Sequence, residues 1–231
     1  MLTLAIDTAT KICSVALCRD REIISEYNVD AGMTHSAHLV PQIEKLFNEC
    51  TVKKSDIDLV AVSIGPGSFT GLRIGLATAE ALAYTWQCSL HGVETLKGMA
   101  YNMPREGILL SPVLNAQKGN YYQGIYKWQS GKVEELQSAC VVGKEELFSN
   151  IASIDMPAML LGECDKLMQD KLPENIIVAP EGLLWPKAAS VALAAIDAFN
   201  AETDKNIFGI KPYYIRKSEA EELWEKRQKQ K

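Results

Sequence analysis

The chain has 231 residues, of which 47% are apolar and 23% are charged. This composition is typical of a globular chain long enough to bury a core, and it excludes wholesale disorder. The 29 acidic side chains outnumber the 24 basic ones, which leaves a net charge of −5. Because binding to nucleic acid needs a basic surface, an independent nucleic-acid-binding protein is disfavoured, whereas an acidic subunit of a larger complex that handles RNA is not.

The front part of the chain predicts three short strands followed by alternating helices and strands. Apolar side chains alternate in the first segments, and an Arg-Asp-Arg turn at 19–21 separates the second strand from the third. A helix is indicated where apolar residues recur at i, i+4, i+7 and i+8. The expected elements are strands at 2–7, 12–17 and 22–29, a helix at 35–50, a strand at 58–64, a helix from 68 or 69 to 84, a strand at 88–92 and a short helix at 94–102.

A weaker repeat of this order follows a Pro- and Gly-containing break at 103–107. Its expected elements are strands near 108–114, 121–128 and 133–141, then a helix, a strand and a last helix at 188–200, and finally an extended segment at 211–216. The tail from Lys217 is rich in Glu, Lys, Arg and Gln, which predicts a solvated end. The order of elements favours an α/β fold of two related halves, 1–106 and 107–231.

A glycine-rich run, Gly65-Pro-Gly-Ser-Phe-Thr-Gly-Leu-Arg-Ile-Gly75, joins a strand to a helix. A turn of this kind can bind an anion, because free backbone N–H groups and the helix dipole point at it. The spacing fits neither GxxxxGK[ST] nor GxGxxG, and the lysine that a P-loop needs is replaced by Leu72-Arg73. Phosphate binding at Gly65 and Gly67 therefore stays an alternative without a matching motif.

The helix after this run has a stripe of residues with almost no side chain, Gly71, Gly75, Ala79 and Ala83. Glycine inside a helix costs about 1 kcal/mol relative to alanine, so a close contact must compensate for it. The stripe could pack on the protein's own sheet or on the 35–50 helix. It could equally form a helix–helix contact with another subunit, because small residues let backbones approach. The spacing leaves both interpretations open.

Asp7-Thr-Ala-Thr10 follows the first strand, where an actin-like ATPase would place its first phosphate loop. In such a loop a carboxylate holds hydrated magnesium and a glycine lets the backbone approach phosphate. Alanine stands at the expected glycine position here. The alternative is that Asp7 and Thr8 form a turn that caps a hairpin.

Other chemistry-bearing residues give little support for a reaction. His35 and His38 share a helix face, but no third metal ligand is near them in sequence, so no metal is expected. Six widely spaced cysteines indicate reduced thiols in a cytoplasmic protein. The longest apolar stretch, near 76–86, contains Glu80 and is too short to span a membrane. Four aromatic residues could stack on bases but more simply face a sheet: Tyr121, Tyr122, Tyr126 and Trp128.

Three motifs together resemble the bacterial TsaB (YeaZ-like) family: Leu4-Ala-Ile-Asp-Thr-Ala-Thr10, His35-Ser-Ala-His-Leu-Val-Pro41 and the 65–75 run. Lys211-Pro-Tyr-Tyr-Ile-Arg216 is similar to the family's Pro-x-Tyr-Leu-Arg element. The resemblance covers nearly the whole chain. It implies an actin-like (ASKHA) α/β fold of two related βββαβα-type subdomains.

The resemblance also implies a non-catalytic subunit in making threonylcarbamoyladenosine next to the tRNA anticodon. In that system TsaD transfers the threonylcarbamoyl group and the ATPase TsaE joins the complex. TsaB-like proteins pair with TsaD through the two helices of the first half, and form homodimers through a similar surface when alone. It implies no cofactor, no membrane contact and only indirect contact with tRNA. The candidate partner-binding residues are His35, Leu39, Ile43, Phe69, Gly71, Leu72, Arg73, Gly75, Ala79 and Ala83.

One segment departs from the resemblance. Where the family commonly shows Asp-Ala-Arg-x-Gly-Glu-Val-Tyr, this chain has Asn115-Ala-Gln-Lys-Gly-Asn-Tyr-Tyr122, in which neutral groups replace three charged ones. The alternative function is an enzyme, either an actin-like ATP-dependent phosphotransferase that uses Asp7 and the loop at Gly65, or a peptidase. For a peptidase, this sequence lacks both a paired metal-binding motif and a recognisable set of nucleophile and base residues.

Overall fold

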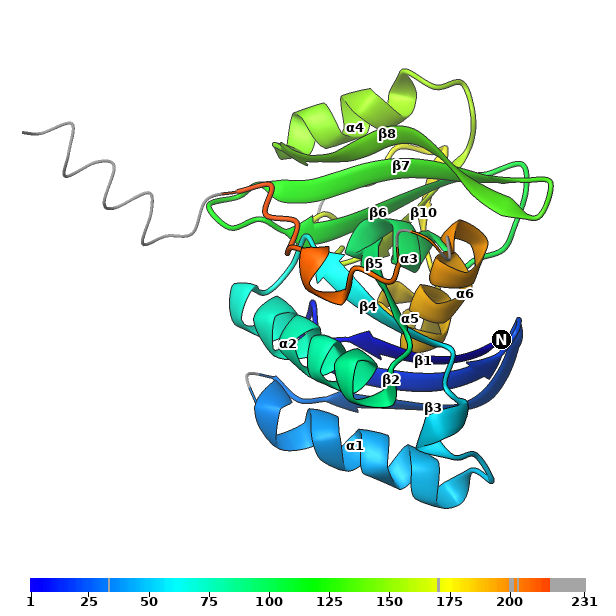
Figure 1. Ribbon diagram of the computed structural model, residues 1–231. Helices are drawn as coiled ribbons and strands as arrows, with labels where there is room; N and C mark the ends of the chain where they lie inside the picture. Colours follow the sequence, from blue (N-terminus) through cyan, green and yellow to red (C-terminus); the bar gives the residue numbers. More distant parts are fainter. Residues whose placement is uncertain (33, 170, 200–201, 203, 217–231) are drawn as a thin grey trace, which may run out of the picture.

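Two five-stranded mixed sheets of matching topology form the two halves of the protein (Figure 1). The computed structural model describes residues 1–32, 34–169, 171–199, 202 and 204–216. The tail expected to be solvated, from Lys217 onward, lies outside the described residues. No helix among the described residues is long and apolar enough to cross a membrane.

In the first sheet the strand order is β3-β2-β1-β4-β5. The first three strands are antiparallel neighbours, whereas β4 and β5 run parallel to β1. The strands are β1 (Leu2–Asp7), β2 (Ile12–Arg19), β3 (Glu22–Asp30), β4 (Leu59–Gly65) and β5 (Ser89–Glu94). The connecting helices are α1 (His35–Glu49), the short η1 (Lys54–Asp56) and α2 (Phe69–Trp86).

The second sheet repeats this order as β8-β7-β6-β9-β10. The strands are β6 (Leu109–Asn115), β7 (Tyr121–Gln129), β8 (Lys132–Val142), β9 (Ala158–Gly162) and β10 (Ile176–Val178). The remaining helices are α3 (Thr95–Ala100), α4 (Lys144–Ala152), α5 (Glu181–Leu184), α6 (Ala188–Ala198) and η2 (Ile207–Gly209). The repeat confirms the predicted α/β fold of two related halves.

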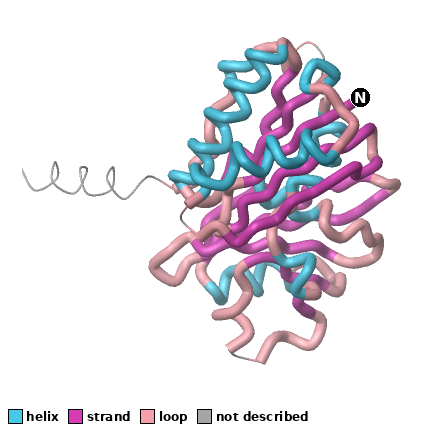
Figure 2. Tube along the Cα trace, turned by 90° about the horizontal axis from the view of Figure 1, so that it is seen from below, coloured by secondary structure: helices cyan, strands magenta, loops and turns pink. Residues whose placement is uncertain are grey.

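The two long helices α1 and α2 cover the outer face of the first sheet (Figures 1 and 2). Their apolar side chains and those of β1, β2 and β4 form one continuous core. The ring of Phe47 in α1 meets that of Trp86 in α2 edge-on, with centroids 5.5 Å apart. The helix α2 starts at Ser68, whose hydroxyl accepts a hydrogen bond from the N–H of Gly71, and ends at Gln87 in the left-handed conformation.

The inner layer between the sheets is made by α3 and α6, which contact each other. The helix α6 packs on β1 and β2 of the first sheet, and α3 packs on β6 and β7 of the second. The N-terminal amides of α6 donate to the first sheet: Ala188 to the Ser14 hydroxyl at 2.8 Å and Ala189 to the Glu26 carboxylate at 2.9 Å. The division at 106/107 therefore separates the two sheets, while each inner helix packs on the sheet of the other half. That the two halves are separate domains stays a prediction.

Candidate functional site

The first residues of the turn that joins β1 to β2, Thr8, Ala9 and Thr10, are buried, and the exposed Lys11 follows them. The Asp7 side chain has no exposed surface, and its two oxygens accept hydrogen bonds from the N–H of Ala9, at 3.0 Å, and from the hydroxyl of Ser63. Burial raises the pKa of Asp7 to about 6, although these hydrogen bonds oppose the rise. The hydroxyl of Thr8 donates to the carbonyl of Gly71 at 2.7 Å. Asp7 and Thr8 thus form a hairpin turn, which is the second of the two interpretations of this motif.

The glycine-rich loop presses against this turn. A Cβ added at Gly67 would lie 2.3 Å from the carbonyl oxygen of Ala9, and one at Gly71 would lie 2.1 Å from that of Thr8. The N–H of Ser68 donates to the Ala9 carbonyl at 2.7 Å, so a donor that a phosphate would use is already bonded. At Gly65, where φ is +120°, a Cβ would lie 2.5 Å from the carbonyl oxygen of Tyr213. These glycines make room for protein backbone, which accounts for the motif without a phosphate.

The small-residue stripe of α2 also faces inward. A Cβ at Gly75 would lie 2.3 Å from the hydroxyl oxygen of Thr8 in the β1–β2 turn and 3.6 Å from the side chain of Val62 in β4, both in the first half. The buried partner-binding candidates are His35, Leu39, Ile43, Gly71, Leu72, Gly75, Ala79 and Ala83. In this structure these residues pack on the protein's own first half, so the exposed candidates Phe69 and Arg73 are the ones accessible to a partner, and the assignment to a partner surface stays a prediction.

The outward faces of α1 and α2 carry different residues. Val40 of α1 is 50% exposed and Tyr84 of α2 is 65% exposed. Also on α2, Ala77 and Ala81 are exposed and one helical turn apart. Sequence reasoning missed this face, although its signal was present: Ala77 and Ala81 lie on the side of the helix opposite to the stripe. Of the ten candidates, only Phe69 and Arg73 are exposed.

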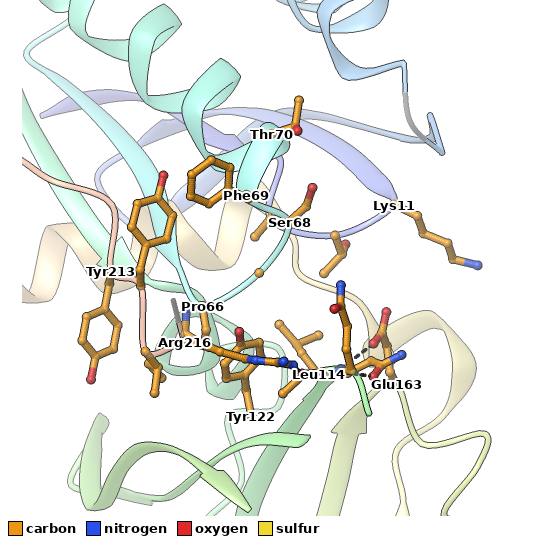
Figure 3. A pocket seen from close by; sticks show the side chains of 18 of the residues that line it. Lys11, Pro66, Ser68, Phe69, Thr70, Leu114, Tyr122, Glu163, Tyr213 and Arg216 are labelled. Carbon is orange, nitrogen blue, oxygen red and sulfur yellow. Dashed lines mark hydrogen bonds between the residues drawn. The ribbon is translucent and has the colours of Figure 1, made fainter. Parts of the chain in front are cut away.

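A cavity of about 650 Å³ opens between the two halves (Figure 3). Four segments line most of it: the β1–β2 turn, the start of α2, the β6–β7 turn and the C-terminal segment 211–216. The altered Asn115–Tyr122 run forms the third of these, with Asn115 and Gln117 at the cavity and the ring of Tyr122 beside it. A cavity between two halves and of this volume is in the range of small-molecule and docking sites.

The C-terminal segment spans this cavity. The N–H of Tyr213 donates to the carbonyl of Ile64 in the first half at 2.7 Å, and the Arg216 guanidinium donates to the carbonyl of Ala116 in the second. Figure 3 shows the Arg216 side chain extending between Pro66 and Tyr122 toward the second half. The segment thereby joins the two halves on one side of the cavity.

The remaining candidates are mostly buried. Tyr121, Tyr126 and Trp128 lie inside the second half, and only Tyr122 reaches the cavity. The His35 ring is 3% exposed, and burial lowers its pKa. Across the residues that the structure describes, no group of three His, Cys, Asp or Glu side chains is placed to hold a metal ion.

Solved structures place this architecture in the actin-like α/β class. A Pseudomonas aeruginosa protein described as similar to the peptidase YeaZ superposes with a TM-score of 0.81 at 24% identity, over 93% of this chain and 99% of that one. A Pseudomonas aeruginosa structure described as YeaZ gives 0.77 at 23% identity, over 92% and 99%. The ethanolamine utilization protein EutJ from Carboxydothermus hydrogenoformans gives 0.51 at 11% identity, over 84% and 90%. At these identities the likeness establishes the fold alone.

Sequence comparisons identify the family. A family model described as "TsaD: tRNA N6-adenosine threonylcarbamoyltransferase" matches residues 29–224. A tRNA threonylcarbamoyladenosine biosynthesis protein TsaB from Bacillus subtilis is 29% identical over 231 residues, 99% of this chain and 100% of that protein. A protein of the same name from Buchnera aphidicola (subsp. Baizongia pistaciae) is 34% identical over 180 residues, 75% and 78% of the two chains. The chain belongs to the TsaB (YeaZ-like) family.

Proposed function

We propose that this protein acts in the biosynthesis of tRNA threonylcarbamoyladenosine as a non-catalytic subunit. It docks the catalytic sister subunit TsaD, helps to form the surface on which the ATPase TsaE binds, and meets tRNA within that complex. The full-length similarity to proteins named for this pathway supports the role in biosynthesis. The division of labour between subunits is the part that needs experimental proof.

The observation that carries the docking role is the outward face of α1 and α2. On this face Val40 of α1 and Ala77, Ala81 and Tyr84 of α2 are apolar or aromatic and exposed, while the opposite sides of both helices carry the buried residues. Exposed alanines one helical turn apart leave the backbone of α2 accessible to a close-packed helix. An exposed aromatic residue beside them supplies the kind of side chain that dominates binding energy at interfaces.

The buried start of the β1–β2 turn supports the non-catalytic part of the proposal. A carboxylate that positions hydrated magnesium must reach solvent, whereas the Asp7 oxygens are buried and bonded to Ala9 and Ser63. The activating effect would then be conformational: a docked subunit stabilises the partner conformer to which it binds more tightly.

The docking test is a charged substitution on the outward face. Ala81→Arg should abolish co-elution with TsaD in size-exclusion chromatography, because it places a cation and a long side chain in an apolar contact. Ala152→Arg is the matched control, since Ala152 is an exposed helical alanine at the end of α4 in the other half. Retained co-elution of a folded Ala81→Arg variant would contradict the proposal. Gly75 is unsuitable for this test, because any side chain there meets Thr8.

The same variants test the consequences for the pathway and for self-association. Cells that depend on Ala81→Arg should lose threonylcarbamoyladenosine from digested tRNA, measured by mass spectrometry, whereas Ala152→Arg cells should retain it. If the isolated protein is a homodimer through a similar surface, Ala81→Arg should be monomeric in sedimentation experiments.

The enzymatic alternative has its own measurement. Titration calorimetry of the isolated protein with magnesium-ATP should give no micromolar binding, because Asp7 is enclosed. Tight binding that disappears in Asp7→Ala would favour a phosphotransferase and overturn the non-catalytic proposal.

A further inference from the structure

Aromatic side chains and one arginine gather where α2 meets the C-terminal segment. The rings of Phe69 and Tyr214 stack with centroids 4.7 Å apart and an interplanar angle of 25°. The Arg73 guanidinium lies 3.9 Å from the Phe69 ring centre, and its Nε donates to the Tyr214 hydroxyl at 3.1 Å. We call these three residues the arginine–aromatic ridge.

The ridge is exposed although its members are large. Phe69 is 37% exposed and Tyr214 is 39% exposed, and both also line the cavity between the halves. Their mutual contacts hold the rings in place before any ligand arrives, which lowers the entropy cost of binding. An exposed, pre-ordered aromatic stack beside a guanidinium is a surface on which another flat ring can continue the stack.

The charge around the cavity is opposite to that of the whole chain. Of the described residues that line the cavity, Lys11 and Arg216 are basic and Glu163 is acidic. The Glu163 carboxylate accepts a hydrogen bond from the N–H of Asn115 at 2.5 Å. Arg73 of the ridge and the exposed Lys118 and Lys211 lie close in sequence to residues of the lining. In a protein of net charge −5, this local excess of basic over acidic side chains favours a polyanion as the ligand.

We propose that the arginine–aromatic ridge and the cavity beside it bind single-stranded RNA, with one unpaired base stacked on Tyr214 and the adjoining phosphates near the basic residues. Stacking platforms flanked by cations are the recurrent means of holding unpaired nucleotides. This inference rests on the proposed role in tRNA modification and adds to it a direct contact of this chain with the substrate RNA. The ridge adjoins the docking face, since Arg73 lies one helical turn before Ala77, but Phe69 and Tyr214 are not part of that face.

An acidic peptide is the other polyanion to consider. An acidic peptide would bind the basic side chains but would gain little from the pre-formed aromatic stack. Every nucleobase, in contrast, has a π-face that can stack on the rings. The combination of ring stack, guanidinium and flanking lysines therefore favours RNA, and an acidic peptide becomes an arm of the test.

The experiment measures fluorescence anisotropy of a labelled anticodon stem–loop RNA titrated with the full-length protein at low ionic strength. Tyr214→Ala should weaken binding at least about fivefold, the lower limit for losing one base stack. Tyr214→Phe should bind nearly as the wild type, because the ring remains. Phe208→Ala is the matched control, since Phe208 is a 67% exposed aromatic residue off the ridge. Arg73→Gln should weaken binding and reduce the dependence on salt by about one counterion.

Four results would overturn the inference. A fully paired duplex that binds as tightly as the stem–loop, or Tyr214→Ala and Phe208→Ala variants with equal affinity, would remove the stacking contact. Displacement of the stem–loop by polyglutamate at comparable concentrations would identify an acidic peptide site, and displacement by low concentrations of AMP would identify a free-nucleotide site.

The two proposals fail in distinguishable ways. Tyr214→Ala should still co-elute with TsaD, since Tyr214 lies outside the docking face. If the Tyr214→Ala variant co-elutes with TsaD and binds RNA as tightly as the wild type, the RNA contact is overturned and the docking role is retained. RNA binding through the ridge without any co-elution of the wild type overturns the docking role alone. Should Tyr214→Ala unfold by circular dichroism, Lys211→Glu, at an exposed residue of the same segment, supplies the same comparison by charge reversal.

Discussion

The two halves of the protein share a strand order but treat the turn after the central strand in opposite ways. At the end of β1, the Asp7 side chain accepts a hydrogen bond from the N–H two residues on, at 3.0 Å; at the end of β6, Asn115 does the same at 2.8 Å. Both turns contribute residues to the cavity, but the Asp7 side chain is buried whereas Asn115 is exposed. The same local hydrogen bond can thus serve a sealed core in one half and an open surface in the other.

The difference originates at the parallel strand that lies beside the central strand in each sheet. Both β4 and β9 end at a glycine with positive φ, Gly65 at +120° and Gly162 at +96°. After Gly65 the chain enters the long helix α2, which covers the turn. After Gly162 a stretch of turns leads to the three-residue strand β10 and the four-residue helix α5, so the second turn stays uncovered. The first half therefore has the outward helical face for docking, and the second half contributes one wall of the cavity.

The largest expected effect comes from loosening the contact between α2 and the first turn. Gly71→Ala should lower the free energy of unfolding by about 3 kcal/mol, because its Cβ would meet backbone that cannot move independently. Gly182→Ala is the control, since a Cβ there meets nothing within 4 Å. Urea unfolding curves should separate the two variants clearly. Equal stability would mean that the first turn is not sealed by α2.

A second measurement tests the buried carboxyl by its pH dependence. Because the folded-state pKa of Asp7 is raised to about 6 from 3.8, the folded protein holds a proton there that the unfolded chain has lost between these values. The stabilising contribution is full below pH 3.8 and disappears as pH rises through 6. Relative to the wild type, Asp7→Asn should therefore gain about 2 kcal/mol between about pH 4 and pH 7.5.

The corresponding substitution in the second half supplies the contrast. Asn115→Asp places a carboxyl at the equivalent but exposed position, so its stability should follow the wild type across the same pH range. Parallel pH profiles for Asp7→Asn and the wild type would show that the first turn is not buried as described.

The smallest expected effect concerns the segment that joins the halves. Arg216→Met removes the guanidinium that donates to Ala116 and should cost about 1 kcal/mol in thermal or urea unfolding. Lys211→Met, at an exposed lysine of the same segment, should change stability by less than about 0.5 kcal/mol. Equal effects of the two substitutions would show that the hydrogen bond from Arg216 to Ala116 does not stabilise the protein.

Much of the fold could be predicted from the chain itself. Alternating apolar residues located the strands of the first sheet, and helical spacing located α1 and α2 to within a few residues. The short elements β10 and α5 were too brief to show a period. The actin-like arrangement came from motif resemblance and was confirmed by superposition.

The site was harder to predict for a physical reason. Periodicity shows that Gly71, Gly75, Ala79 and Ala83 share a face, but it does not show what covers that face, because the covering strand lies more than 60 residues away. The exposed Ala77 and Ala81 can be located only as the positions opposite to that stripe, because alanine occurs on packed and exposed faces alike. The ridge joins α2 to the C-terminal segment across 141 positions, a separation that no local pattern contains.

The exchange of inner helices between the sheets has a consequence for synthesis of the protein. The first sheet emerges early, yet the helix that covers its inner face, α6 (Ala188–Ala198), is translated only after the last strand of the second sheet. Until α6 has been made, the inner apolar face of the first sheet stays open to chaperones and aggregation.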